Sequence, residues 1–169
     1  MRTITSGLIV CGLACLPLAA QNGGGNISDQ AFVDLAAQTD MTEAHLGQMA
    51  QETASSQQIK DYASMLVTDH TADYKKLSAV ATKAGLTVPK GLNPQHDKMI
   101  APFEKLKGKA FDARYVKDMV MGHETAIAAY EKESRDGQNP DLKTYATEAL
   151  PILHKHEDAA KDLRKSKSS

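Results

Sequence analysis

Three histidines follow an aliphatic residue at the same spacing, in three separate parts of the chain. The pattern aliphatic-x-x-His occurs at Val67–His70, Val120–His123 and Leu153–His156. Each histidine continues an apolar stripe with helical spacing, so we expect three imidazoles to point into one helical interior. Imidazole is among the commonest metal-binding side chains, and the pattern therefore indicates a buried polar site with metal-binding chemistry.

A carboxylate interrupts the apolar stripe of the first predicted helix, because Glu43 stands where a leucine would be expected. Residues counted from the predicted turns, at roughly 1.5 Å of rise each, put Glu43 and His70 about 5 Å apart in level and His123 and His156 about 7 Å apart. Side chains of this length can span such offsets. We therefore predict one layer in the middle of a bundle, with one residue from each helix: Glu43, His70, His123 and His156.

This layer would be costly to bury without partners, since it holds one carboxylate and three imidazoles. A transition metal would satisfy these groups, and zinc, copper, iron or manganese all suit imidazole with one or two carboxylates. A hydrogen-bonded network, with or without water, is the alternative. Asp73 and Glu124 are candidate additional metal ligands, and Asp69 could orient an imidazole from behind. The other three histidines are assigned to surface roles: His45, His96 and His154.

Helical periods dominate the chain, and no segment alternates as a β-strand would. The apolar stripes predict four long helices over residues 29–54, 55–83, 110–135 and 140–164. A capping box at Ser55–Gln58 is predicted to start the second helix. Pro151 falls inside the fourth helix and is expected to kink it. The predicted fold class is an all-α four-helix bundle.

One connection is much longer than the others. Residues 86–108 link the second and third long helices, and Asn93-Pro94 is a start signal for a short helix that Gly108 would close. A link of this length can travel the full length of a bundle. The third long helix is therefore expected to run parallel to the second.

The first twenty residues have the layout of a secretory signal, with Arg2, an apolar run and two small residues at the end. We expect cleavage after Ala20 and a periplasmic or envelope location; acylation of Cys15, as in a lipoprotein, is the alternative. The apolar run is too short to span a membrane, and no other segment would. The expected domains are a signal peptide at 1–20, a flexible tether at 21–27, the bundle at 28–165 and a basic tail at 166–169.

Both cysteines lie within the predicted signal, so the mature chain would have no disulfide and would depend on packing for stability. Without Arg2 the chain has 19 basic and 21 acidic residues, which gives no indication of nucleic-acid binding. The expected partner is a metal ion. A second copy of the chain, to which surplus apolar surface would bind, or an envelope protein is the other expected partner.

Several segments together resemble an exported, ferritin-like bacterial family catalogued as domain of unknown function 4142, often labelled as membrane or outer-membrane proteins. The segments are Glu43-x-x-Leu46-Gly-Gln-Met-Ala50, Met65-x-Val67-x-Asp69-His70, Phe111-Asp112-x-x-Tyr115, Met119-Val120-x-x-His123-Glu124 and Leu150-Pro151-x-Leu153-x-x-His156. The resemblance implies a ferritin-like bundle in the cell envelope, without an established activity. Di-iron proteins of that wider superfamily use Glu-x-x-His, whereas here an aliphatic residue occupies the Glu position. The departure favours a His-rich site.

The sequence thus predicts an exported bundle that binds a transition metal through its polar layer. The alternative is a metal-free envelope bundle that binds a protein partner or acts under stress, with the layer as a hydrogen-bond network. A third hypothesis is a redox or hydrolytic enzyme whose metal ion has an open coordination position. No nucleophile with its base and no cofactor motif in the sequence identifies a reaction.

Overall fold

Four long helices and two short helical segments make up most of residues 28–166, the part of the chain that this computed structural model describes. The elements are α1 (Asp29–Thr53), α2 (Gln57–Lys83), α3 (Pro94–Ile100), the 3-10 helix η1 (Ala101–Lys105), α4 (Gly108–Asp136) and α5 (Pro140–Ser166). The predicted all-α bundle, with a long crossover that carries a short helix, is confirmed. The predicted signal peptide and tether lie outside the described residues, as does most of the basic tail.

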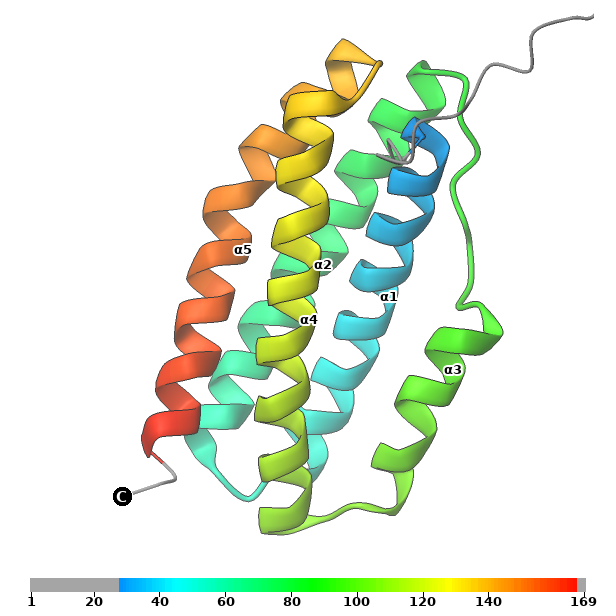
Figure 1. The fold of residues 1–169 in the computed structure, drawn as a ribbon. Helices are drawn as coiled ribbons and strands as arrows, with labels where there is room; N and C mark the ends of the chain where they lie inside the picture. The colour runs from blue at the N-terminus through cyan, green and yellow to red at the C-terminus, as the bar shows by residue number, and fades with distance from the viewer. Residues whose placement is uncertain (1–27, 167–169) are drawn as a thin grey trace, which may run out of the picture.

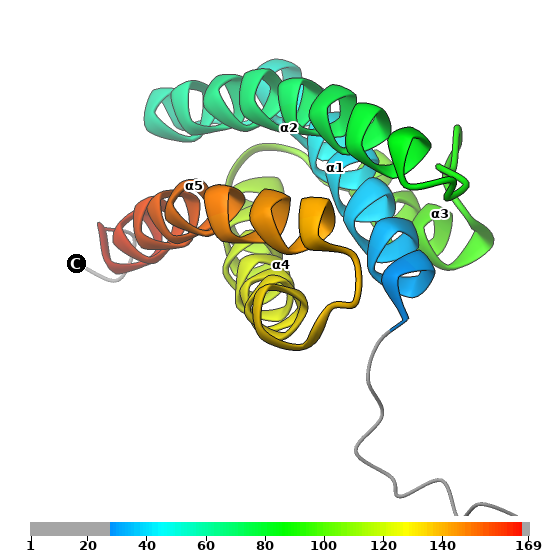
Figure 2. The same cartoon turned by 90° about the horizontal axis from the view of Figure 1, so that it is seen from above.

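The bundle consists of two helical hairpins joined by the crossover. In Figure 1, α1 and α5 run from top to bottom, whereas α2 and α4 run from bottom to top. The third long helix is therefore parallel to the second, as the long connection predicted. Figure 2 shows the α1/α2 hairpin lying against the α4/α5 hairpin, with α3 on the outside of α1. Side chains from all four long helices can consequently meet on the bundle axis.

Local polar contacts explain where α1, α3 and α5 begin. The Ser28 hydroxyl oxygen accepts a hydrogen bond from the Ala31 amide at the start of α1. Asn93 and Asn139 each accept from two backbone amides in the first turns of α3 and α5. Each of these asparagines is followed by a proline, whose missing N–H would have no partner at that position anyway.

The start of α2 differs from the prediction. Its cap residue is Ser56, whose side chain makes no capping bond, so the predicted capping box at Ser55–Gln58 is wrong. Ser55 instead donates from its amide and its hydroxyl to the two carboxylate oxygens of Asp112, at 3.0 and 2.7 Å. A charged carboxylate is a stronger hydrogen-bond acceptor than a neutral carbonyl or hydroxyl oxygen. This contact links the α1/α2 turn to the N-terminal part of α4.

Gly108 also has a different role from the predicted one. It begins α4 with a positive φ of 57°, a conformation that favours glycine, whereas the short helix ends earlier, at Ile100, and passes into η1. Pro151 lies within α5, and the helix continues on both sides of it. The kink at Pro151 stays a prediction.

The apolar core is divided into two clusters. The cluster nearer the α1/α2 turn includes Leu46, Leu66, Phe111 and Tyr115. The cluster at the other end of the bundle includes Phe32, Leu77, Tyr130 and Tyr145. On each long helix, the residue of the predicted polar layer falls between the residues of these two clusters. Apolar side chains therefore shield the layer from water at both ends, which strengthens electrostatic interactions inside it.

A buried carboxylate lies outside the layer, near the end of α4. The Glu133 side chain is buried, and neither of its oxygens has a hydrogen-bond partner within residues 28–166. Burial, with a smaller effect of Asp29, raises the pKa of Glu133 to about 7, although Lys143 opposes the rise. The charged form therefore costs stability above pH 7, and the cost disappears as the pH falls toward the ordinary value of the group.

The Glu133→Gln variant should thus be more stable than the wild type at pH 8, by about 1–2 kcal/mol, because the amide carries no charge to bury. At pH 5 the gain in stability should shrink to about a third of that value, because the Glu133 carboxyl of the folded wild type is then already protonated. Urea unfolding at the two pH values measures both differences. An equal gain at both values would show that the carboxylate charge is not the cause.

Candidate metal centre

The four residues of the predicted layer meet in the structure. Glu43, His70, His123 and His156 extend from α1, α2, α4 and α5, and none is more than 4% exposed. The three imidazole centroids are 5.3 to 5.8 Å apart, and one ring nitrogen from each lies within 4.8 Å of the others. The Glu43 Oε2 atom is 3.0 Å from Nε2 of His70 and 3.3 Å from Nε2 of His123. The layer therefore holds three imidazoles and one carboxylate at ligand-like spacing.

One nitrogen of each imidazole is held by a contact on the outer side of the layer. The Nδ1 atom of His70 is 2.8 Å from Oδ1 of Asp40. The Nδ1 atom of His123 donates to the Met119 carbonyl at 2.9 Å, and Nε2 of His156 is 2.9 Å from Oδ2 of Asp69. Such contacts fix the ring orientation and the tautomer, so that the other nitrogen of a neutral ring presents its lone pair.

The remaining polar atoms of the layer have no hydrogen-bond partner among the described residues. They are Nε2 of His70, Nε2 of His123, Nδ1 of His156 and Oε2 of Glu43. Glu43 and His70 nevertheless form an ion pair, with Oε2 3.0 Å from Nε2. Buried polar atoms without a hydrogen bond are expensive, and a shared partner would satisfy all four of them, which extend from four helices. Three nitrogens and one oxygen fit the donor set of a transition-metal ion.

The charges in the layer differ from one imidazole to the next. Burial would lower the pKa of His70, but the carboxylates of Glu43 and Asp40 outweigh burial and raise this pKa well above its ordinary value. Burial likewise acts to raise the pKa of Glu43, yet His123 and His70 bring it below its ordinary value. Without an ion, His70 is thus a cation stabilised chiefly by Glu43, since burial raises the pKa of Asp40 itself to about 7. His70 must release a proton before Nε2 can bind a metal.

His156 behaves in the opposite way. Burial lowers its pKa to about 4, although the hydrogen bond to Asp69 acts in the other direction. The ring is therefore neutral at physiological pH, and its inward Nδ1 is available as a ligand without loss of a proton.

Two further residues that the sequence offered as ligands lie away from the layer. Asp73 accepts a hydrogen bond from the Tyr145 hydroxyl at 2.6 Å and lies 3.5 Å from that of Tyr130. The Glu124 side chain is exposed and faces Lys161 at 3.9 Å. The structure therefore brings together Glu43 and the three histidines, but neither Asp73 nor Glu124. Of the remaining histidines, His45 and His154 are exposed and His96 is half-buried against Asn93.

Asp40 is the member of the site that the sequence did not single out. It is buried, and it lies three residues before Glu43 on α1, which places both carboxylates on the same face of the helix. A second acidic residue at this spacing on an apolar stripe was the signal that could have identified it. Asp69, in contrast, occupies the orienting position behind an imidazole that the sequence suggested for it.

The fold and the layer define a class of protein: a helical bundle whose core holds a candidate metal centre built from one residue of each long helix. The family model described as Domain of unknown function (DUF4142) matches residues 15–163, and the chain belongs to this family. The resemblance noted in the sequence is thereby confirmed. Among curated protein sequences, none matches the chain.

A solved structure with a similar fold is "CopM in the Cu(II)-bound form", which superposes with a TM-score of 0.68. The two chains are 15% identical over 82% of this chain and 97% of that chain. A likeness at this identity establishes the shared fold alone. Within residues 28–166, no helix has the length and apolar character needed to cross a membrane.

Proposed function

We propose that this protein is an exported, periplasmic bundle that binds a transition-metal ion through Glu43, His70, His123 and His156. The observation that supports the proposal best is a set of four buried atoms, three nitrogens and one oxygen, which come from four different helices and make no hydrogen bond within residues 28–166. An ion that bound them would satisfy all four at once. It would also link the two hairpins, since each hairpin contributes two of the ligands.

The donor set narrows the choice of ion. Imidazole suits copper, zinc, iron and nickel, while a site for magnesium or calcium would be rich in oxygen ligands. Copper(II) also forms the most stable complexes among the divalent first-row ions. The similar bundle of CopM was solved with Cu(II). Copper(II) is therefore the first ion to test, with zinc as the comparison.

The test is metal analysis of protein that has been exported with its own leader and purified without chelators. We expect a single transition-metal ion per chain, and a chelator should lower the melting temperature. The proposal fails if no metal co-purifies and no added transition metal raises the melting temperature.

A second candidate function is supported by the contacts of His70. Asp40 and Glu43 approach its two nitrogens at 2.8 and 3.0 Å, so the layer has an internal ion pair even without a metal. The bundle would then be a metal-free envelope protein that binds a partner, with the layer as a buried polar network. Such networks often tolerate replacement by apolar residues, whereas a metal site does not.

The contact behind His156 gives a prediction for the metal affinity. Asp69→Asn keeps an acceptor for Nε2 of His156 but removes the charge that makes the ring a better ligand. The dissociation constant should rise about tenfold, the lower end of the effect of such outer contacts. Competition with a coloured chelator measures this change. Asp141→Asn is the matched control, because Asp141 pairs with Lys83 on the surface and is outside the lining of the pockets, and it should leave the affinity unchanged. An equal loss in both variants would show that net charge, and not the contact with His156, sets the affinity.

A further inference from the structure

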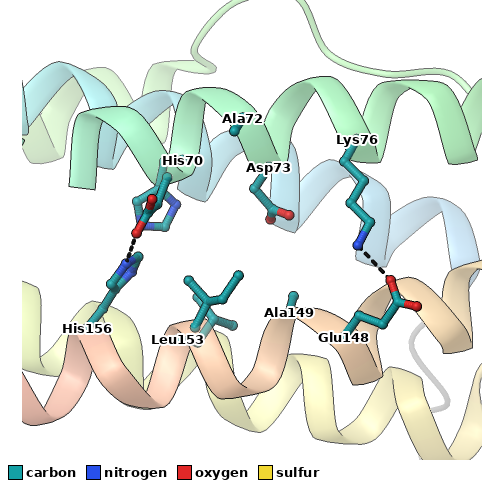
Figure 3. A pocket seen from close by; sticks show the side chains of 10 residues that line it. His70, Ala72, Asp73, Lys76, Glu148, Ala149, Leu153 and His156 are labelled. Carbon is teal, nitrogen blue, oxygen red and sulfur yellow. Dashed lines mark hydrogen bonds and ion pairs between the residues drawn. The ribbon is translucent and has the colours of Figure 1, made fainter. Parts of the chain in front are cut away.

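A pocket of about 180 Å³ between α2 and α5 opens directly onto the polar layer. Its lining includes Asp69, His70, Ala72, Asp73, Leu153 and His156. Figure 3 shows the side chains of α2 and α5 facing each other across it, with His70 and His156 at one end and the Lys76–Glu148 pair at the other. Two of the four proposed ligands thus form part of the pocket wall.

Carboxylates outnumber cations along this pocket. Three carboxylates line it: Asp69, Asp73 and Glu148. The cations are Lys76, which is paired with Glu148 at 2.7 Å, and the protonated His70, which is paired with Glu43 at 3.0 Å. The pocket therefore has a negative field that raises the local concentration of cations. Asp69 is 33% exposed and also contacts His156, so it reaches both the solvent and the layer.

Two other openings present fewer of the proposed ligand atoms to a cation from solvent. A groove between α1, α3 and α4 touches Glu43 but none of the three imidazoles of the layer. A third hollow, between α1 and α2, reaches His70 from the side of Asp40, where Nδ1 already has a partner. The α2/α5 pocket is lined by two imidazoles, His70 and His156, that each have a buried nitrogen without a hydrogen bond.

We propose that the α2/α5 pocket is the port through which the metal ion enters and leaves the centre, with Asp69 as the first carboxylate that it meets. This inference rests on the proposed function. Asp69, His156 and His70 line the port, whereas the other two proposed ligands, Glu43 and His123, are outside its lining. The bound ion is accordingly exchangeable with solvent although its ligands are buried. An obstruction at the mouth should slow uptake and release by the same factor, since it changes the barrier and not the bound state.

Ala72 allows this to be tested, because it is exposed on α2 and lines the pocket. Ala79 is its matched control, exposed on the same helix and outside the lining of all three openings. In stopped-flow experiments with Cu(II) and the full chain, Ala72→Phe should slow both uptake and chelator-driven release by about tenfold or more, with the dissociation constant unchanged within about twofold. Ala79→Phe should behave as the wild type.

A charge series gives a second readout at the same positions. Ala72→Lys should slow Cu(II) uptake more at low salt than at high salt, because the added cation opposes the negative field of the pocket. Ala79→Lys adds the same net charge elsewhere on α2 and should have little effect. The series separates electrostatic steering through the port from a general effect of charge.

Two results would overturn the port. In the first, both Ala72 variants take up Cu(II) at the wild-type rate, whereas Met121→Lys slows Cu(II) uptake. Met121 is exposed and lines the groove between α1, α3 and α4. In the other, the Ala79 variants are as slow as the Ala72 variants. If the wild type itself takes up no ion, the proposed function fails together with the port. If the wild type binds the ion through the layer but the Ala72 variants take it up and release it at the wild-type rates, only the proposed port fails.

Discussion

The His123→Leu variant should lose metal binding by a factor of about a thousand or more, which corresponds to about 4 kcal/mol. His123 is fully buried, and its inward Nε2 is one of the four atoms of the layer that make no hydrogen bond within residues 28–166. Leucine fills a similar volume but offers no lone pair. Titration with Cu(II) in competition with a chelator measures the loss.

The same variant separates the metal centre from a metal-free polar network. With a chelator present, His123→Leu should be as stable as the wild type or more so, because an orphaned nitrogen is replaced by an apolar group between two apolar clusters. With Cu(II) present, the variant should melt below the wild type. His154→Leu, which changes an exposed histidine on α5, is the control and should keep both properties. Identical behaviour of wild type and His123→Leu with and without metal would favour the polar network.

Addition of the ion to metal-free wild type should raise the melting temperature by roughly 8–15 °C. An ion that binds the folded chain alone stabilises it by about 4 kcal/mol at a free concentration a thousand times the dissociation constant. For a domain of this size each kcal/mol corresponds to about 2–4 °C. Thermal unfolding followed by circular dichroism, before and after addition of Cu(II) and again after a chelator, measures the change. A rise of the same size in His123→Leu would place the responsible ion outside the layer.

Much of the fold and the position of the layer could be predicted from the sequence. The apolar stripes fix which face of each helix is buried, and the turns fix the level of each residue along the axis. Glu43 and His70 were therefore predictable as neighbours from their distances to one turn, and His123 and His156 from their distances to the next. The long crossover likewise determined that α4 runs parallel to α2.

The contacts of individual polar side chains were less predictable, because they depend on partners far away in the sequence. Ser55 has the sequence signature of a capping residue, yet it bonds Asp112, 57 residues later. Asp73 follows His70 by one helical turn, which suggested a shared site. Its carboxylate instead accepts a hydrogen bond from the hydroxyl of Tyr145 on α5. Which helix faces a given residue was predictable here; which side chain meets it was not, because that choice depends on rotamers and packing.

The most direct test of the metal centre is a crystal structure of protein loaded with its native metal, with anomalous data collected on both sides of the absorption edge of that metal. We expect one anomalous peak in the polar layer, bonded to Oε2 of Glu43, Nε2 of His70, Nε2 of His123 and Nδ1 of His156 at about 2.0–2.2 Å. A layer that contains only water or direct hydrogen bonds, with the ion bound elsewhere, would contradict the proposed centre.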